Sequence, residues 1–203
     1  GPNARQVMQK ISPSHDFTKE NFPHMSFQNV EIDSVSCRVM RISFTGELCY
    51  EINVPSSYAN SAWKKCIEAG QEFNITPYGT EAMHVLRAEK GFIIVGQETD
   101  GSTTPIDLDM DWIVSKKKYD FIGKRALSRS DTIKEDRKQL VGLLTKNPNE
   151  ILEEGAQLVE RETALPMNMV GHVTSSYYSP NLGRSFALAL VKGGINKKGC
   201  KLL

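Results

Sequence analysis

Four strand patterns follow one another closely in the last third of the chain, and they restrict its fold more than any other feature. They lie at residues 139–145, 157–161, 170–177 and 185–191, and turn-rich loops separate them. Short strands at this spacing are typical of a small antiparallel barrel or sandwich.

The preceding residues mix strand and helix signals. Residues 35–54 alternate on both sides of Gly46, which predicts strand–turn–strand. A helix is predicted from Ser56 or Ser57 to Ala69. On that helix the predicted core face consists of Tyr58, Ala62, Trp63 and Cys66.

Further elements are expected in the same part of the chain. A helix is predicted at 81–90, with Met83, Val85 and Leu86 on its buried side. Helices at 2–11 and 122–128, strands at 93–95 and 110–115, and a loop at 12–28 complete the set. The charged stretch 130–136 suggests a boundary. We therefore expect an α+β domain at 1–130 and a β-barrel domain at 131–203.

Composition excludes several classes of function. The formal charge is +1, from 25 basic and 24 acidic side chains, which argues against a nucleic-acid partner. No stretch approaches the roughly 20 apolar residues of a membrane span, and no secretory signal is present. The four cysteines show no metal-binding spacing, so we expect free thiols, no metal and a cytoplasmic location.

Known catalytic fingerprints do not occur in the chain. It contains neither a Gly-x-Gly-x-x-Gly dinucleotide motif nor a phosphate loop, and no Gly-x-Ser-x-Gly elbow. Pattern alone therefore predicts the architecture but no chemistry.

A resemblance to a known family supplies what pattern lacks. Ordered landmarks spanning almost the whole chain resemble the T-protein of the glycine cleavage system; they are Gly1-Pro-Asn-Ala-Arg5, residues 42–52, Val85-Leu-Arg-Ala-Glu-Lys-Gly91, Gly96-Gln-Glu with Thr104-Pro105, residues 121–127, and residues 171–176 with Ser179-Pro180. Within that family, residues 77–84 and 110–118 are most similar to the C-terminal region of heterotetrameric sarcosine oxidase alpha subunits. The resemblance implies a T-protein-like α+β domain lacking its N-terminal part, followed by the barrel.

That resemblance also implies an activity. The region would bind tetrahydrofolate and capture the one-carbon unit of sarcosine as 5,10-methylenetetrahydrofolate. Flavin and NAD would bind other parts of the enzyme, and the partners would be the other sarcosine oxidase subunits. The chain alone is expected to be inactive and to bind folate weakly at best.

Three site residues are carried over from the family. A carboxylate matches the amino group and ring N–H of a pterin, and Glu51, within the apolar strand 50–54, matches the family position that does this. Trp112 matches a family tryptophan near the benzoyl part of folate, and Phe44 stands where the family has a tyrosine. We expect a buried Glu51 and Trp112 to meet in one cavity.

Other positions depart from the family. Met83-His84 replaces an Arg-Asp pair whose arginine contacts folate. Arg87 and Glu89, by contrast, keep the family pattern and are interpreted as a structural pair. The family's key aspartate lies upstream of the Gly1 landmark, so no catalytic residue is named. Two alternatives stay open: an assembly module with vestigial folate binding, and a stand-alone folate-dependent aminomethyltransferase or demethylase.

Overall fold

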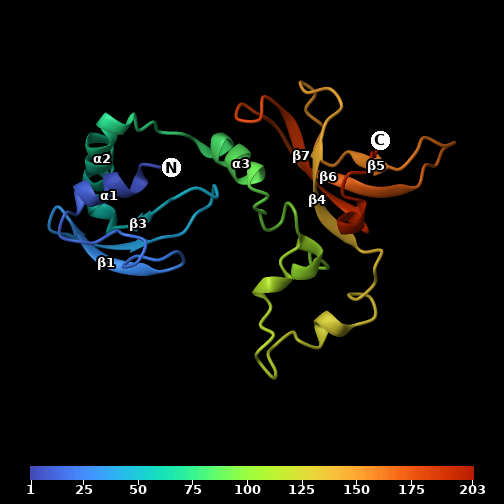
Figure 1. Cartoon of the computed structure of the whole chain (residues 1–203), viewed down its shortest axis with the longest axis horizontal. Helices are drawn as coiled ribbons and strands as arrows, with labels where there is room; N and C mark the ends of the chain where they lie inside the picture. The colour runs from blue at the N-terminus through green and yellow to red at the C-terminus, as the bar shows by residue number, and fades with distance from the viewer. The chain divides into compact units, whose positions relative to one another are not determined.

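The computed structural model describes all residues from 1 to 203 and divides them into two compact units, Gly1–Phe92 and Ile93–Leu203 (Figure 1). Helices α1 to α3 belong to the first unit, and strands β4 to β7 belong to the second. None of the helices is long and apolar enough to cross a membrane.

The first unit contains a three-stranded antiparallel sheet in the order β1-β2-β3. Strands β1 (Phe27–Ile32) and β2 (Val35–Met40) form a hairpin, and β3 (Glu51–Asn53) pairs with β2. Asp33 and Ser34 both have positive φ angles, as a two-residue type I′ turn requires. The predicted strand–turn–strand is confirmed, but the start of β1 was expected in a loop. The apolar residues Phe27, Val30 and Ile32 do not alternate strictly, so a period of two did not indicate this strand.

One face of this sheet packs against helices. Helix α1 (Ala4–Ile11) contributes Met8 and Ile11 to the core, and α2 (Ala59–Gly70) packs on it through Cys66 and Ala69. The remaining buried members of this core are Phe17, Phe22, Val30, Ile32, Cys37 and Val39. Because strand side chains alternate, the other face of the sheet carries a separate set of side chains.

The helices predicted in the first unit form, but the buried faces of α2 and α3 differ from expectation. On α2 and the short helix η1 (Ser56–Tyr58) that precedes it, Tyr58 is 46% and Trp63 56% exposed, so α2 packs mainly through its C-terminal half. On α3 (Thr80–Glu89), the expected residues are only half-buried, whereas Arg87 and Ala88 are buried. Helical spacing predicted where α2 and α3 lie, but not which of their residues are buried. A short helix η2 (Gln71–Phe73) follows α2.

The segment before the sheet of the second unit, 93–137, is irregular, and three expectations fail there. No strand forms at 93–95, because the N–H of Ile94 binds the Glu98 side chain and its carbonyl accepts from Gln97 and Glu98. At 110–115 the chain forms the 3₁₀ helix η4 (Asp111–Ile113) instead of a strand.

The third failure is the helix expected at 122–128. Gly123 has φ +94°, a value that a right-handed helix cannot accommodate, so only η5 (Ala126–Ser128) forms. Upstream of η4 lies one further 3₁₀ helix, η3 (Pro105–Leu108).

A four-stranded antiparallel sheet makes up the rest of the second unit. Its strands β4 (Lys138–Leu144), β5 (Gln157–Val159), β6 (Met169–Ser179) and β7 (Arg184–Lys192) lie in the order β4-β7-β6-β5. The small antiparallel β domain predicted from the spacing is confirmed. A short helix, η6 (Gly194–Lys197), follows β7.

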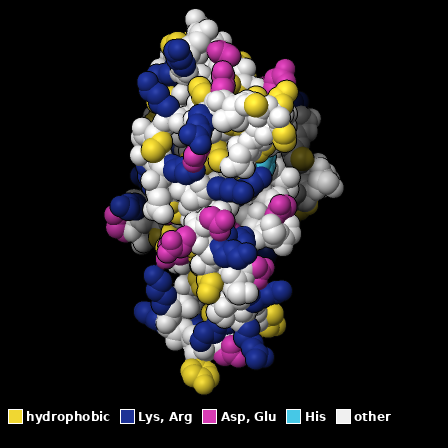
Figure 2. Space-filling view, turned by 90° about the vertical axis from the view of Figure 1, so that its right-hand side faces the viewer, with side chains coloured by type: hydrophobic (Ala, Val, Ile, Leu, Met, Phe, Trp, Pro, Cys, Tyr) yellow, Lys and Arg dark blue, Asp and Glu magenta, His cyan; other side chains and the backbone are white.

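The expected boundary at 130/131 falls inside the second unit, shortly before β4 begins, and as a domain division it stays a prediction. Basic and acidic side chains intermingle on the face that Figure 2 shows, as the nearly balanced composition implies.

Candidate functional site

The open face of the three-stranded sheet carries Glu51. Register places Glu51 opposite Met40, and Met40 opposite Phe27, so a carboxylate, a thioether and a phenyl ring lie in one row across the three strands. The next row consists of Asn53, Arg38 and Asn29. This face therefore offers one acid beside apolar surface and several polar groups.

Glu51 is exposed, which corrects the expectation of a buried acid. Its neighbour Ile52 packs against the core, so strand alternation turns Glu51 to the opposite face. Asn53 Nδ2 donates a hydrogen bond to Glu51 Oε1 over 3.2 Å. That contact leaves Oε2 available to another donor.

Phe44 lies in the loop between β2 and β3 and is 48% exposed. Two hydroxyl groups surround the thiol of Cys49 in the same loop: Ser43 Oγ lies 3.6 Å and Thr45 Oγ1 3.5 Å from the sulfur. Gly46 has φ +79°, and a Cβ there would collide with the Lys90 side chain. The loop is thus closed by local contacts, while Phe44 remains accessible instead of joining the core.

Trp112 belongs to the second unit and is 74% exposed on η4. Nearby residues form an open, mainly apolar hollow of about 410 Å³, which Trp112 itself does not line. The lining residues are Pro105, Ile113, Val114, Ser115, Lys118, Phe121, Ile122, Gly123 and Leu127. Because Glu51 and Phe44 belong to the first unit, a cavity shared with Trp112 stays a prediction.

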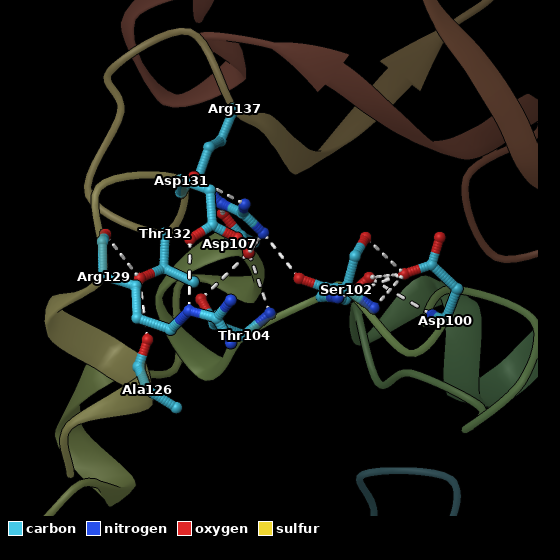
Figure 3. Close-up of polar contacts among 10 residues, drawn as sticks. Asp100, Ser102, Thr104, Asp107, Ala126, Arg129, Asp131, Thr132 and Arg137 are labelled. Carbon is cyan, nitrogen blue, oxygen red and sulfur yellow. Dashed lines mark hydrogen bonds and ion pairs between the residues drawn. The ribbon is translucent and has the colours of Figure 1, made fainter. Parts of the chain in front are cut away.

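An ion pair between the buried Asp107 and the half-buried Arg137 holds the η3 turn (Figure 3). Arg137 donates from Nε to Asp107 Oδ1 over 2.8 Å and from Nη2 to Asp107 Oδ2 over 2.6 Å, a bidentate arrangement. Its remaining hydrogen bonds reach the carbonyls of Ser102, at 2.6 Å, and Asp131, at 3.0 Å. One guanidinium therefore joins three irregular parts of the chain.

The same carboxylate caps η3. The Thr104 N–H and hydroxyl donate to Asp107 Oδ2 over 2.8 and 2.9 Å. The Thr104 side chain in turn accepts from the backbone N–H of Asp107, which completes a capping box. Burial on its own would raise the pKa of Asp107, but the hydrogen bonds from Arg137 and Thr104 outweigh it and hold the pKa below the usual value. Asp107 is therefore ionised at neutral pH although it is only 2% exposed.

Sequence reasoning did not identify Asp107 or Arg137. Thr104 followed three residues later by an acidic residue is the signature of a capping box and could have indicated Asp107. No local signal indicates Arg137, because it lies 30 residues from its partner.

The α3 residues noted in the sequence are half-buried or buried. His84 is half-buried on α3. Arg87 is fully buried and donates to the carbonyl of Phe92 over 3.0 Å, which is a structural contact. Its pairing with Glu89 stays a prediction.

Comparison with known proteins decides the family. The GCVT N-terminal domain matches residues 1–118, and the glycine cleavage T-protein C-terminal barrel domain matches residues 138–202. The first match alone covers more than half of the chain. The chain belongs to the glycine cleavage T-protein family. The resemblance seen in the sequence is thereby confirmed.

Relatives within the T-protein family include oxidase subunits. The chain is 54% identical over 205 residues to sarcosine oxidase subunit alpha of Corynebacterium sp. (strain P-1), an alignment that covers 98% of this chain and 21% of that protein. Identity to the corresponding subunit of Rhizobium meliloti is 39%, with 100% of this chain and 21% of the relative covered. The chain thus spans about a fifth of the length of these subunits.

Other T-protein relatives are aminomethyltransferases. The enzyme of Thermoanaerobacter pseudethanolicus is 33% identical, over 94% of this chain and 50% of its own length. The crystal structure of aminomethyltransferase T of the glycine cleavage system from Bartonella henselae matches with a TM-score of 0.72 and 26% identity, covering 88% of this chain and 47% of that one. This match confirms the T-protein-like fold.

Proposed function

We propose that this chain is the folate-binding region of a sarcosine oxidase alpha subunit. Its high identity to such a subunit, along nearly the whole of this chain, is the observation that carries the proposal. The region would capture the one-carbon unit released from sarcosine on tetrahydrofolate and yield 5,10-methylenetetrahydrofolate. Oxidation of the amine would take place at a flavin in a partner subunit.

Glu51 is the proposed ligand of the pterin edge. Its Oε2 is free of the Asn53 contact and its Oε1 can accept a second hydrogen bond, so the accessible carboxylate can accept from the amino group and ring N–H of a pterin through two parallel hydrogen bonds. Met40 and Phe27, in the same row, offer apolar surface for a flat ring. An accepting carboxylate beside apolar surface supports the proposal that this face binds a pterin.

Phe44 and Trp112 are proposed to contribute apolar faces to folate binding. Both rings are accessible, so neither is committed to the core of its unit. A tryptophan offers a large apolar surface with a single donor, which suits contact with an aromatic ligand.

Positioning is the proposed contribution of these residues to the reaction. Bound tetrahydrofolate would supply the nucleophilic nitrogen. Holding that nitrogen in line with the electrophilic carbon lowers the barrier without strong acid–base help from the protein. The chain's part is then to bind folate and fix its orientation.

The proposal is tested on the full-length protein assembled with its partner subunits. With sarcosine as substrate, methylenetetrahydrofolate should form faster than it does by the spontaneous condensation of tetrahydrofolate with formaldehyde supplied at the same rate. Equal rates at saturating tetrahydrofolate, with sarcosine oxidation intact, would contradict it.

An assembly module with vestigial folate binding is the second candidate. Met83-His84 in place of the family's Arg-Asp pair favours it, as does Phe44 where the family has a tyrosine. Calorimetry of the intact assembly separates the two, because only a folate-binding region gives saturable heat with tetrahydrofolate. The third candidate, a stand-alone aminomethyltransferase, is tested by the length of the natural reading frame. An upstream dinucleotide-binding region would indicate an oxidase subunit instead.

A further inference from the structure

Trp112 has little side-chain packing to fix its position. Its indole is 74% exposed, and η4, which carries it, is a single 3₁₀ turn within an irregular segment. An isolated turn of this length does not hold one conformation by itself. Contacts elsewhere must therefore position the backbone that carries Trp112.

A continuous set of hydrogen bonds connects η4 to η3. The N–H of Met110 donates to the carbonyl of Pro105 over 2.9 Å, and the N–H of Ile113 donates to the carbonyl of Met110 over 3.1 Å. Asp107, within η3, binds Thr104 at the start of that turn. The two turns thus form one hydrogen-bonded segment that includes Trp112.

Arg137 attaches this segment to the four-stranded sheet. It directly precedes β4, and its carbonyl accepts the N–H of Gly193 over 2.9 Å, next to the paired residues Lys138 and Lys192. Its guanidinium binds both oxygens of Asp107. The backbone of Arg137 is therefore fixed by the sheet, while its side chain fixes η3.

We infer that Arg137, through its bidentate pair with Asp107, is the positioning residue that places Trp112 for folate, a role that rests on the proposed folate function. Lysine cannot replace arginine here, because an ammonium group cannot bind both carboxylate oxygens and two carbonyls in one plane. Arg137→Lys keeps the positive charge but cannot form the bidentate pair with Asp107. It is therefore the informative substitution.

The first arm of the test needs no folate. It uses the full-length protein, in which the contribution of Trp112 is the difference between anisotropy decays recorded with Trp112 and with Trp112→Phe, for Arg137 and for Arg137→Lys alike. Arg137→Lys should increase the fast local component of that Trp112 contribution. The decay of the remaining indoles, including Trp63 on the first unit, should not respond. Arg129→Lys, which alters an exposed ion pair with Asp131, is the matched control and should leave Trp112 unchanged.

The second arm measures tetrahydrofolate binding by titration of the full-length protein assembled with its partners. Arg137→Lys should weaken binding by roughly tenfold, the equivalent of losing one charge-assisted hydrogen bond, and Arg129→Lys should not. An unchanged Trp112 decay overturns the positioning role, and so does a changed decay with unchanged folate affinity. If the wild-type assembly binds no folate, the proposed function fails, while the first arm still decides whether Arg137 holds Trp112.

Discussion

The hydroxyl of Ser175 donates a hydrogen bond to the carboxylate of Glu98 inside the second unit, where both side chains are fully enclosed. Glu98 Oε2 accepts the N–H of Ile94 over 2.7 Å, and Gln97 Nε2 donates to Ser175 Oγ over 3.0 Å. Strand β6 is thereby joined to the turn at 94–98. A buried carboxylate needs such donors, since burying it without them is costly.

Ser175→Ala should destabilise the second unit by about 1–3 kcal/mol, because the variant removes a donor from a buried acceptor. Urea denaturation followed by circular dichroism measures the change. Ser185→Ala is the matched control: this serine is equally buried, but its hydroxyl has no hydrogen-bond partner, so its removal should cost far less. Equal losses for the two variants would contradict the role given to Ser175.

Asp107→Asn should lower the free energy of unfolding by about 2 kcal/mol at neutral pH, because it breaks charge-assisted hydrogen bonds between a buried carboxylate and the half-buried Arg137. The folded-state pKa of Asp107 lies below 3.8, so its stabilising contribution is complete above that value and is lost as the pH falls through the folded pKa. The difference in the free energy of unfolding between wild type and variant should therefore become smaller at acidic pH. A difference that is constant from neutral pH down to the acid range would refute this assignment.

His172 offers a second pH-dependent contact. Burial first, and then the charge of Lys138, lower its pKa below 6.5; Lys138 Nζ lies 3.2 Å from His172 Nδ1. The unfolded state then binds the proton more readily, so stability should decline as the pH falls below 6.5.

Lys138→Gln removes the charge and should raise the pKa of His172, as followed by NMR of the imidazole protons during a pH titration. Lys192→Gln, at the residue paired with Lys138 across the strands, is the control and should have a smaller effect. A pKa that does not respond to Lys138→Gln would show that burial alone sets it.

Phe22→Ala should cost about 3–5 kcal/mol, because Phe22 is fully buried and its ring lies 5.7 Å from those of both Phe17 and Tyr50. Phe44→Ala removes the same side chain at an accessible position of the same unit and should change stability little. Thermal unfolding of the two variants compares them directly. Similar losses would mean that Phe44 is a core residue and not a ligand contact.

Sequence periodicity predicted the regular elements well, because each depends on local alternation or helical spacing. The four strands of the second unit form within two residues of their expected bounds. The failures lie where long-range polar contacts decide the backbone: Glu98 binds the N–H of Ile94 in place of a strand partner, and Arg137 holds η3. Neither contact leaves a local pattern in the sequence.

The site was less predictable than the fold. Glu51, Phe44 and Trp112 were named from family resemblance, and the sequence correctly placed Glu51 on a strand. It gave the wrong burial for Glu51, because strand alternation shows that two faces exist but not which one the helices cover. For Trp112, the expected strand is a 3₁₀ turn.

Titration of tetrahydrofolate into the full-length protein with its partner subunits, for Glu51→Gln against wild type, tests the central claim most directly. The substitution keeps the size of the side chain and removes the charge, so affinity should fall roughly tenfold or more. Glu31→Gln is the control, since Glu31 is an exposed acid on the same sheet face. Weaker binding for Glu51→Gln alone is the predicted result. Equal affinity for wild type and both variants would show that Glu51 does not bind folate.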